Sequence, residues 1–366
     1  MRGGIEHGGR FFEELGVDFA HLERRAKVVN ADVLDAWYDP SPRVLAALKD
    51  ALPWLVRTSP PVRAEGVVAA IAEARGVPEA CVVVGAGSSS LIFSALPRFV
   101  APSCGAVVLD PSYGEYEFVL TRHLGVRVER VILDGSNEFV PDVRRVADAA
   151  RGAHLLVMVN PNSPTGVGLT RDEMVELLDS LGADTVVWVD ETYIDFLGTE
   201  HSLEPLVGSR RNLIVCKSMS KYYALSGLRC GYLVVPPCLR ELLDEVVPPW
   251  PLGLPAQVAA VEALRDGQYY LQMAKETARL RSELASALAE IDGLRVYPSC
   301  ANFLLVRSLE PRPAASEVVG RCAEESVHLR DCTSMSSRDF SRYIRVAVKD
   351  EASNARIVEA VRAAVQ

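Results

Sequence analysis

The chain has 366 residues, of which 49% are hydrophobic and 24% charged, a composition typical of globular proteins. Its net charge of −9 at pH 7 argues against a nucleic acid or an anionic membrane surface as a partner. The eight cysteines form no Cys-x-x-Cys pair and no Cys/His cluster of zinc spacing, so we expect no metal site and a reducing, cytoplasmic location.

We expect no membrane-spanning segment and no signal peptide. The first residues lack the apolar run that a signal peptide requires. An uncharged span over residues 80–97 contains Gly85 and Gly87, and we interpret it as a strand, a turn and a helix.

The first 42 residues mix polar helical segments with an irregular stretch over residues 35–42. The Pro-Ser-Pro sequence at residues 40–42 predicts a helix start, because apolar residues follow at helical spacing. A second amphipathic helix is predicted over residues 67–75. From about residue 80, helical segments alternate with short valine-rich apolar runs at residues 81–84, 106–109, 155–159, 185–189, 213–216 and 232–235.

These runs are continuous rather than alternating, which is typical of strands covered on both faces. They predict an α/β protein whose mainly parallel sheet lies between helices. A long helical stretch over residues 256–291 and shorter strands at 294–297, 302–306, 327–330 and 343–348 follow. We therefore predict a large α/β domain at residues 43–245 and a smaller α+β domain formed by residues 1–42 and 246–366.

The most informative stretch runs from Cys216 to Tyr232, between two apolar runs. Lys221 is flanked there by apolar and aromatic residues, so its amine loses hydration and is more easily deprotonated. A neutral amine can attack an aldehyde and form a Schiff base. Ser218, Ser220 and Arg229 supply hydroxyl and guanidinium donors of the kind that hold a phosphate. A Schiff-base lysine beside a phosphate cup suggests pyridoxal 5′-phosphate.

This stretch resembles the cofactor-lysine motif of the fold-type-I class I and II aminotransferases. The resemblance is strongest to the branch of histidinol-phosphate aminotransferase and threonine-phosphate decarboxylase, and it covers most of residues 65–366. It implies the fold of type I pyridoxal phosphate-dependent transferases, with a seven-stranded type of sheet in the large domain. It also implies a homodimer, because the site in this family is built at the subunit interface.

Further motifs at predicted strand ends resemble the cofactor site of the family. Gly87, Ser88 and Ser89 match its phosphate loop, where a helix N-terminus offers free N–H donors. Tyr113 matches the aromatic residue that stacks on the cofactor ring. The family's Asn-Pro-Asn-Asn-Pro-Thr-Gly motif places an asparagine on the phenolic oxygen. This chain has Ser163 there, so either Ser163 substitutes or Asn162 turns inward.

Asp190 and Tyr193 end another valine-rich run and match two further cofactor ligands. A carboxylate against the pyridine nitrogen keeps that nitrogen protonated, and the positive charge makes the ring an electron sink. The resemblance assigns this role to Asp190 and the second contact to the phenolic oxygen to Tyr193.

On the substrate side, the resemblance implies that Arg345 binds the α-carboxylate. An arginine inside an apolar strand is costly without a carboxylate partner. Asn302 matches an asparagine near the same carboxylate, and Arg330 matches an arginine that binds the substrate's phosphate. The alternative for Arg330 is a structural salt bridge with Asp331. We also assign Tyr38 to the substrate side.

The chain departs from the family in the segments that close over the substrate. Both relatives carry an Asn-rich loop where this chain has the shorter segment 35–39. They also carry an Arg-Tyr-Pro turn whose tyrosine reaches the partner subunit's cofactor, and residues 55–61 contain no tyrosine. We infer that the substrate is not simply the housekeeping one.

The resemblance implies transamination, with Lys221 moving the α-carbon proton as base and then as acid. Decarboxylation at the same site, and elimination or replacement chemistry in specialised metabolism, are alternatives. A cofactor-binding regulatory protein would carry a basic DNA-binding segment, which this acidic chain lacks. The sequence leaves open the amino donor, the acceptor, the pathway and whether the substrate carries phosphate.

Overall fold

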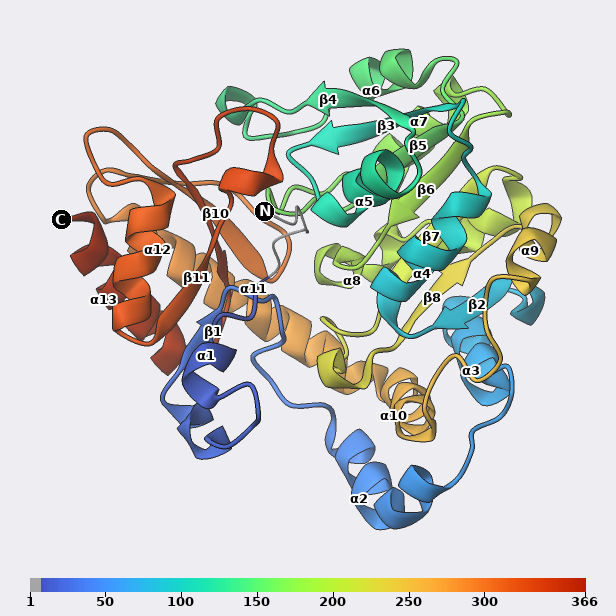
Figure 1. Cartoon of the computed structure of the whole chain (residues 1–366), viewed down its shortest axis with the longest axis horizontal. Coiled ribbons are helices and arrows are strands. Elements are labelled where there is room, and N and C mark those ends of the chain that lie inside the picture. Colours follow the sequence, from blue (N-terminus) through green and yellow to red (C-terminus); the bar gives the residue numbers. More distant parts are fainter. Residues whose placement is uncertain (1–7) are drawn as a thin grey trace.

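The computed structural model describes residues 8–366, and a mixed seven-stranded sheet forms its larger part (Figure 1). The strand order is β2-β8-β7-β6-β5-β3-β4. All neighbours pair in parallel except β8, which is antiparallel to both β2 and β7. The strands are β2 (Val82–Gly85), β3 (Gly105–Asp110), β4 (Arg127–Ile132), β5 (Leu155–Val159), β6 (Val186–Asp190), β7 (Leu213–Ser218) and β8 (Gly231–Val234).

Each of the six predicted apolar runs is a strand of this sheet, and the predicted α/β architecture is confirmed. The seventh strand, β4, was not predicted. It lies at the edge of the sheet, and its first four residues alternate between exposed and partly buried while Val131 is buried. It therefore carries charges instead of a continuous apolar run.

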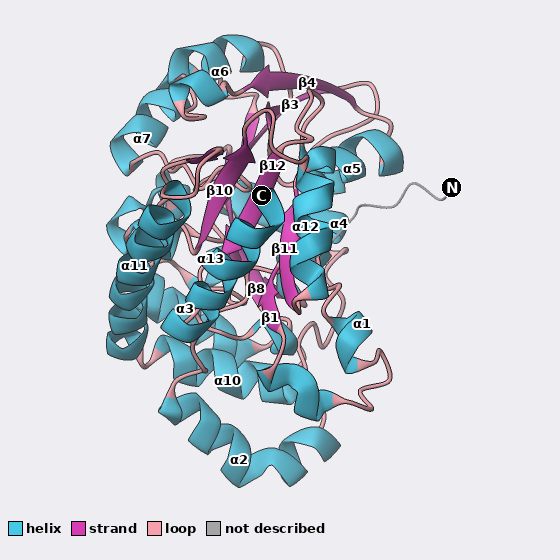
Figure 2. Cartoon of the chain, turned by 90° about the vertical axis from the view of Figure 1, so that its left-hand side faces the viewer, coloured by secondary structure: helices cyan, strands magenta, loops and turns pink. Residues whose placement is uncertain are grey.

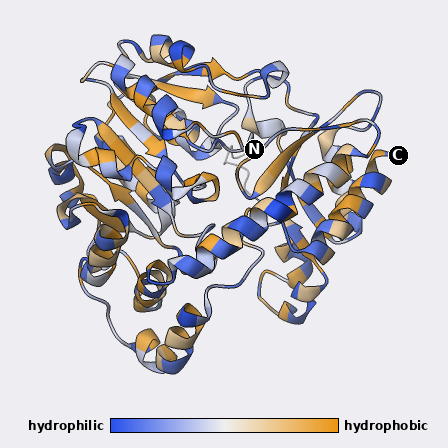
Figure 3. Cartoon of the chain, turned by 180° about the vertical axis from the view of Figure 1, so that it is seen from behind, coloured by the Kyte–Doolittle hydropathy of each residue, from blue (hydrophilic) through white to orange (hydrophobic). Residues whose placement is uncertain are grey.

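Successive residues of the central strands point to opposite faces and enter two separate cores. In β5, Leu156 and Met158 join one core, while Leu155 and Val157 join the other. The first core includes residues of α3 (Glu65–Arg75), α6 (Val143–Ala150) and α7 (Arg171–Ser180). The second includes residues of α4 (Gly87–Ala95), α5 (Gly114–Phe118) and α9 (Pro237–Asp244). Figure 3 shows the hydrophobic strands enclosed by helices with mixed faces.

A second sheet of five strands has the order β1-β11-β12-β10-β9. The first strand comes from the N-terminal segment and pairs in parallel with β11, about 300 residues later in the chain. Helices α11, α12 and α13 lie beside this sheet in the views of Figure 1 and Figure 2. Its strands are β1 (Val29–Ala31), β9 (Leu294–Val296), β10 (Phe303–Ser308), β11 (Val327–Asp331) and β12 (Tyr343–Ala347), and the helices are α11 (Gly267–Ala289), α12 (Ala315–Glu324) and α13 (Glu351–Val365).

The remaining helices are α1 (Phe12–Leu15), α2 (Pro42–Arg57), α8 (Ile194–Leu197) and α10 (Leu254–Leu264). The predicted helical stretch 256–291 is two helices, α10 and α11, because the chain breaks at Asp266. Helix α10 packs against α2 and α3. The division into a domain of residues 43–245 and a domain of residues 1–42 and 246–366 remains a prediction. In the described part of the chain, no helix is long and apolar enough to cross a membrane.

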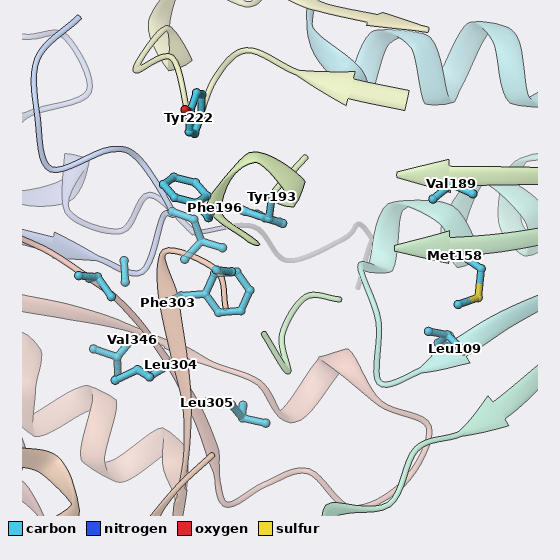
Figure 4. Close-up of a cluster of buried hydrophobic side chains, with 14 of the residues drawn as sticks. Leu109, Met158, Val189, Tyr193, Phe196, Tyr222, Phe303, Leu304, Leu305 and Val346 are labelled. Carbon is cyan, nitrogen blue, oxygen red and sulfur yellow. The ribbon is translucent and has the colours of Figure 1, made fainter. Parts of the chain in front are cut away.

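One continuous core joins the two sheets. Val189 and Met158 of the large sheet belong to the same buried cluster as Phe303 and Val346 of the small sheet. Tyr193 lies between them and meets the Phe303 ring edge-on, with 5.2 Å between ring centroids (Figure 4). The two sheets therefore hold the carboxyl ends of β5 and β6 against β10 and β12.

Candidate active site

A cavity of about 190 Å³ lies at the carboxyl ends of the parallel strands, the edge at which α/β sheets bind ligands. Register places these ends side by side, because Val159 pairs with Asp190 and Asp190 pairs with Cys216. The small sheet closes the cavity through β12 and the segment after β1. The predicted site residues that line it are Ser88, Ser89, Tyr113, Ser163, Asp190, Tyr193, Ser218, Ser220, Lys221, Arg229 and Arg345.

One end of the cavity is built to receive an anion. Helix α4 begins at Gly87, whose φ is +84°, and a Cβ there would lie 2.7 Å from Nη2 of Arg229. Gly231 is equally constrained, because its Cβ would lie 2.6 Å from the backbone nitrogen of Ser88. These glycines let the helix N-terminus, the guanidinium and the Ser220 hydroxyl come together, with Nη1 of Arg229 3.4 Å from Oγ of Ser220.

Lys221 lies in the same cavity with its side chain 16% exposed. Its Nζ donates a hydrogen bond to Oδ1 of Asp35 at 3.2 Å. Burial lowers the pKa of the Lys221 amine, and the Asp35 charge opposes that effect without cancelling it. The amine is therefore easier to deprotonate than a lysine in water.

Asp190 is buried at the end of β6, and three donors hold its carboxylate. Oδ1 accepts from the backbone nitrogen and the hydroxyl of Thr192 at 2.9 and 2.6 Å, and Oδ2 accepts from the Tyr116 hydroxyl at 2.7 Å. The Tyr116 hydroxyl in turn accepts from Nε1 of Trp188 at 3.0 Å. Burial raises the pKa of Asp190 despite these hydrogen bonds. The carboxylate is fixed in place beside the cavity.

Residues 160–166 settle the placement of Asn162 and Ser163. The Asn162 amide donates to the Pro111 carbonyl at 2.9 Å and to Oγ1 of Thr165 at 3.1 Å, so it holds the loop together. Ser163 lines the cavity, whereas Asn162 is not among the described residues that do. Of the two residues, Ser163 is therefore the one that lines the cavity.

Arg345 reaches the cavity from β12 and is buried. Its Nη1 donates to Oγ of Ser163 at 3.0 Å and its Nη2 to the Asp32 carbonyl at 3.1 Å. Its Nε has no hydrogen-bond partner, and among residues 8–366 no carboxylate forms an ion pair with the guanidinium. A buried cation with spare donors is a site for an anion.

Five predicted site residues are not among those that line this cavity: Gly87, Asn162, Asn302, Tyr38 and Arg330. Asn302 donates to the Leu34 carbonyl at 3.0 Å, and its Oδ1 is buried without a partner among the described residues. Tyr38 is buried, and its hydroxyl donates to the Tyr222 carbonyl at 2.7 Å, so it braces the lysine loop instead of facing the cavity.

Arg330 lines a second cavity of about 560 Å³, which shares Tyr113 and Arg345 with the first. It pairs in register with Arg345 across β11 and β12. The Asp331 carboxylate accepts from the backbone nitrogen and the hydroxyl of Thr333. The second cavity continues from the Arg345 end of the site.

A buried cluster of charged residues that the sequence analysis did not predict lies next to the ends of β6 and β7. Nζ of Lys217 lies 3.1 Å from Asp195, 3.5 Å from Glu191 and 3.6 Å from Glu204. Arg75 also contacts Asp195 at 2.9 Å and Glu204 at 3.6 Å. We call these five residues the charge cluster. Glu191 follows Asp190 directly, so the cluster fixes the backbone from which the site residues project.

Comparison with known families gives a match over residues 29–361 to the model of aminotransferase class I and II. The histidinol-phosphate aminotransferase of Roseiflexus castenholzii is 35% identical over 286 residues, which are 77% of this chain and 75% of that protein. The enzyme of the same name from Methanoculleus marisnigri is 32% identical over 323 residues, 88% of this chain and 87% of its own.

Solved structures share the fold at lower identity. Histidinol-phosphate aminotransferase from Sinorhizobium meliloti, in complex with pyridoxal 5′-phosphate, has a TM-score of 0.83 at 20% identity and covers 100% of this chain and 99% of its own. L-threonine-O-3-phosphate decarboxylase from Porphyromonas gingivalis has a TM-score of 0.80 at 24% identity, with coverage of 92% and 99%. The predicted fold is confirmed.

Proposed function

The chain belongs to the aminotransferase class I and II family and is a pyridoxal 5′-phosphate-dependent aminotransferase, and we propose that it acts on an amino acid or amino-phosphate of the histidinol-phosphate kind. The observation that carries the proposal is the cavity itself. Within about 190 Å³ it brings together the Lys221 amine of lowered pKa, the Asp190 carboxylate, the anion-binding end at Arg229 and a second cation, Arg345.

The residues of the cavity fit the cofactor. The cup of Ser88, Ser220 and Arg229 matches its phosphate, and the two glycines beside the cup exclude the Cβ atoms that would fill it. Asp190 supplies a carboxylate for the ring nitrogen, and the Tyr113 ring supplies an aromatic face. When bound, the cofactor supplies an electron sink for the pair of electrons released at the substrate's α-carbon.

Each protein group then has a defined task. Lys221 holds the cofactor, and its Nζ takes the proton from the α-carbon of the substrate and later returns a proton. The lowered pKa of this amine favours the neutral form that acts as a base. Asp190, held by Thr192 and Tyr116, keeps the ring nitrogen protonated, because a fixed negative charge favours the protonated form.

Arg345 binds the substrate's carboxylate. Its Nε has no hydrogen-bond partner, and the planar guanidinium can donate two parallel hydrogen bonds to a carboxylate. Asn302, with a free Oδ1, lies near this position. Arg330 and the cavity of about 560 Å³ would take the distal end of the substrate, including a phosphate group.

We also propose a homodimer. Leu45, Leu52 and Trp54 of α2 are 45%, 48% and 50% exposed, and α2 projects from the rest of the chain in Figures 1 and 2. Trp250 is 55% exposed and bonds through its backbone to Val62, which is 48% exposed. So much exposed apolar surface in one region is typical of an interface with a second copy.

Sedimentation of the protein should give the mass of a dimer, and Trp54→Glu should weaken dimerisation.

The test of the reaction is to add amino acids singly, phosphorylated ones included, while keto product and carbon dioxide are measured together. Conversion of the bound cofactor to its amine form with release of keto product supports transamination. Carbon dioxide without keto product would overturn it in favour of decarboxylation. A cofactor band that persists in Lys221→Ala would overturn the assignment of the lysine.

A further inference from the structure

The segment that follows β1 is fastened to the small sheet through its backbone. Three side chains from β12 and from the residues next to β10 and β12 donate to its carbonyls. Arg345 donates to Asp32 at 3.1 Å, Asn302 to Leu34 at 3.0 Å, and Lys349 to Asp35 at 3.0 Å. Three separate donors on one short segment leave its backbone little freedom. We call residues 32–35 the strap.

The side chain at the end of the strap points to the site. The Asp35 carboxylate lies 3.2 Å from Nζ of Lys221, although the two residues are 186 positions apart in the chain. Among the described residues no other carboxylate is ion-paired with Lys221.

We propose that Asp35 is a positioning residue that holds the released Lys221 amine beside the substrate's α-carbon and pairs with the ammonium ion that forms once Nζ has taken the proton, and that Lys349 sets the charge balance of this contact. The inference rests on the proposed role of Lys221. It adds a residue that acts through Lys221 and does not touch the reacting atoms.

The charges around Lys221 support this assignment. Besides Asp35, the amine faces Arg229 from its own loop and Arg345 from β12, and Lys349 adds a third cation after β12. Asp190 and Tyr193 face it from the end of β6, and both lie in the cavity lining. Asp35 is, among the described residues, the carboxylate in ion-pair contact with the amine, opposite these three cations. Without it, the protonated form of Lys221 would lose its ion-pair partner.

Asp35 itself stays ionised. Burial acts to raise its pKa, but the charge of Lys221 and hydrogen bonds from Ser226 and Lys221 outweigh burial, and the pKa lies below its usual value. Lys349 is the opposite case, because burial lowers the pKa of its amine to about 8. The contact thus combines an ionised carboxylate of the strap with a nearby cation, Lys349, whose pKa is about 8.

The test is a pH titration of the visible absorbance of the cofactor bound to Lys221, in the holoenzyme. Asp35→Asn should move the midpoint to lower pH by about one unit or more, because a neutral amide no longer favours the protonated nitrogen. Lys349→Met should move it to higher pH, because a neighbouring cation is removed. Asp39, an exposed carboxylate in the segment that follows the strap, provides the control. Asp39→Asn should leave the midpoint unchanged.

Kinetics supply a second readout. Asp35→Asn should lower kcat on the order of 10²-fold, as expected for a misplaced base, and leave KM unchanged because Arg345 is untouched. Asp35→Glu should restore the titration midpoint in part. Unchanged midpoints in both Asp35→Asn and Lys349→Met would overturn the proposal, and if Asp35→Asn fails to fold, Lys349→Met alone decides it. Absence of a borohydride-reducible link to Lys221 in the unmodified enzyme would instead overturn the proposed function.

Discussion

Replacing Lys217 by methionine tests whether the charge cluster holds the strand ends in place. Methionine keeps a similar length but removes the positive charge that lies within 3.6 Å of three carboxylates. Arg75 would then be the single cation of the cluster, opposite Glu191, Asp195 and Glu204. Lys217 is only 2% exposed, so water cannot replace the lost partner.

The magnitude follows from the burial. Removing one partner of a buried ion pair costs about 3–5 kcal/mol, because the remaining charge is left uncompensated. The same change at a surface pair costs about 0–1 kcal/mol. Arg210 and Asp179 form such a pair at 2.7 Å, with Asp179 62% exposed, so Arg210→Met is a matched control.

The assay is urea unfolding of each variant at pH 7, followed by tryptophan fluorescence. Lys217→Met should lower the free energy of unfolding by several kcal/mol more than Arg210→Met. Adding Glu191→Gln should recover part of the loss, since it removes one of the unpaired negative charges. Equal losses in Lys217→Met and Arg210→Met, or no recovery in the double variant, would refute the reasoning.

Three further predictions concern the site. Gly231→Ala should weaken cofactor retention at least tenfold, because its Cβ would lie 2.6 and 2.7 Å from backbone atoms of Ser88 and Gly87 that cannot move aside, and equilibrium dialysis measures the loss. Arg345→Gln should raise KM for a carboxylate substrate by about 10²-fold, as a lost charge-assisted pair of about 3 kcal/mol implies, while binding of the cofactor stays unchanged. The folded-state pKa of Lys349 is lowered from 10.5 to about 8, so the folded protein binds fewer protons than the unfolded chain between these values. Stability of the unmodified enzyme relative to Lys349→Met should therefore rise by up to about 3 kcal/mol as the pH rises from 8 to 10.5, and a flat difference would contradict the lowered pKa.

The strands and the cofactor motifs could be predicted because both are local in sequence. A continuous apolar run marks a strand covered on both faces, and the residues that follow it must lie at the carboxyl edge of the sheet. Asp190 and Lys221 follow this rule, whereas Arg229 precedes the antiparallel strand β8. Strand β4 escaped prediction because an edge strand with alternating exposure has no continuous apolar run.

Contacts between distant segments could not be predicted in this way. Asp35 meets Lys221 only because β1 joins the small sheet, and nothing in residues 29–35 indicates that partner. The orientation of Asn162 depends on the Pro111 carbonyl, 51 positions away. Tyr38 was assigned to the substrate, but its hydroxyl bonds to the Tyr222 carbonyl, a backbone group that a sequence pattern does not reveal.

The pairing of β1 with β11 also bears on how the chain matures during synthesis. Residues 29–31 leave the ribosome early, but their partner strand at residues 327–331 follows about 300 residues later. At about 5–20 residues per second this delay is roughly 15–60 s. The last strand of the large sheet, β8, ends at Val234, about 90 residues before β11 begins, so that sheet can form around Lys221 before Asp35 and Arg345 are brought to it. The part of the site on the large sheet can therefore form before the part that Asp35 and Arg345 contribute, because that part requires β11 and β12.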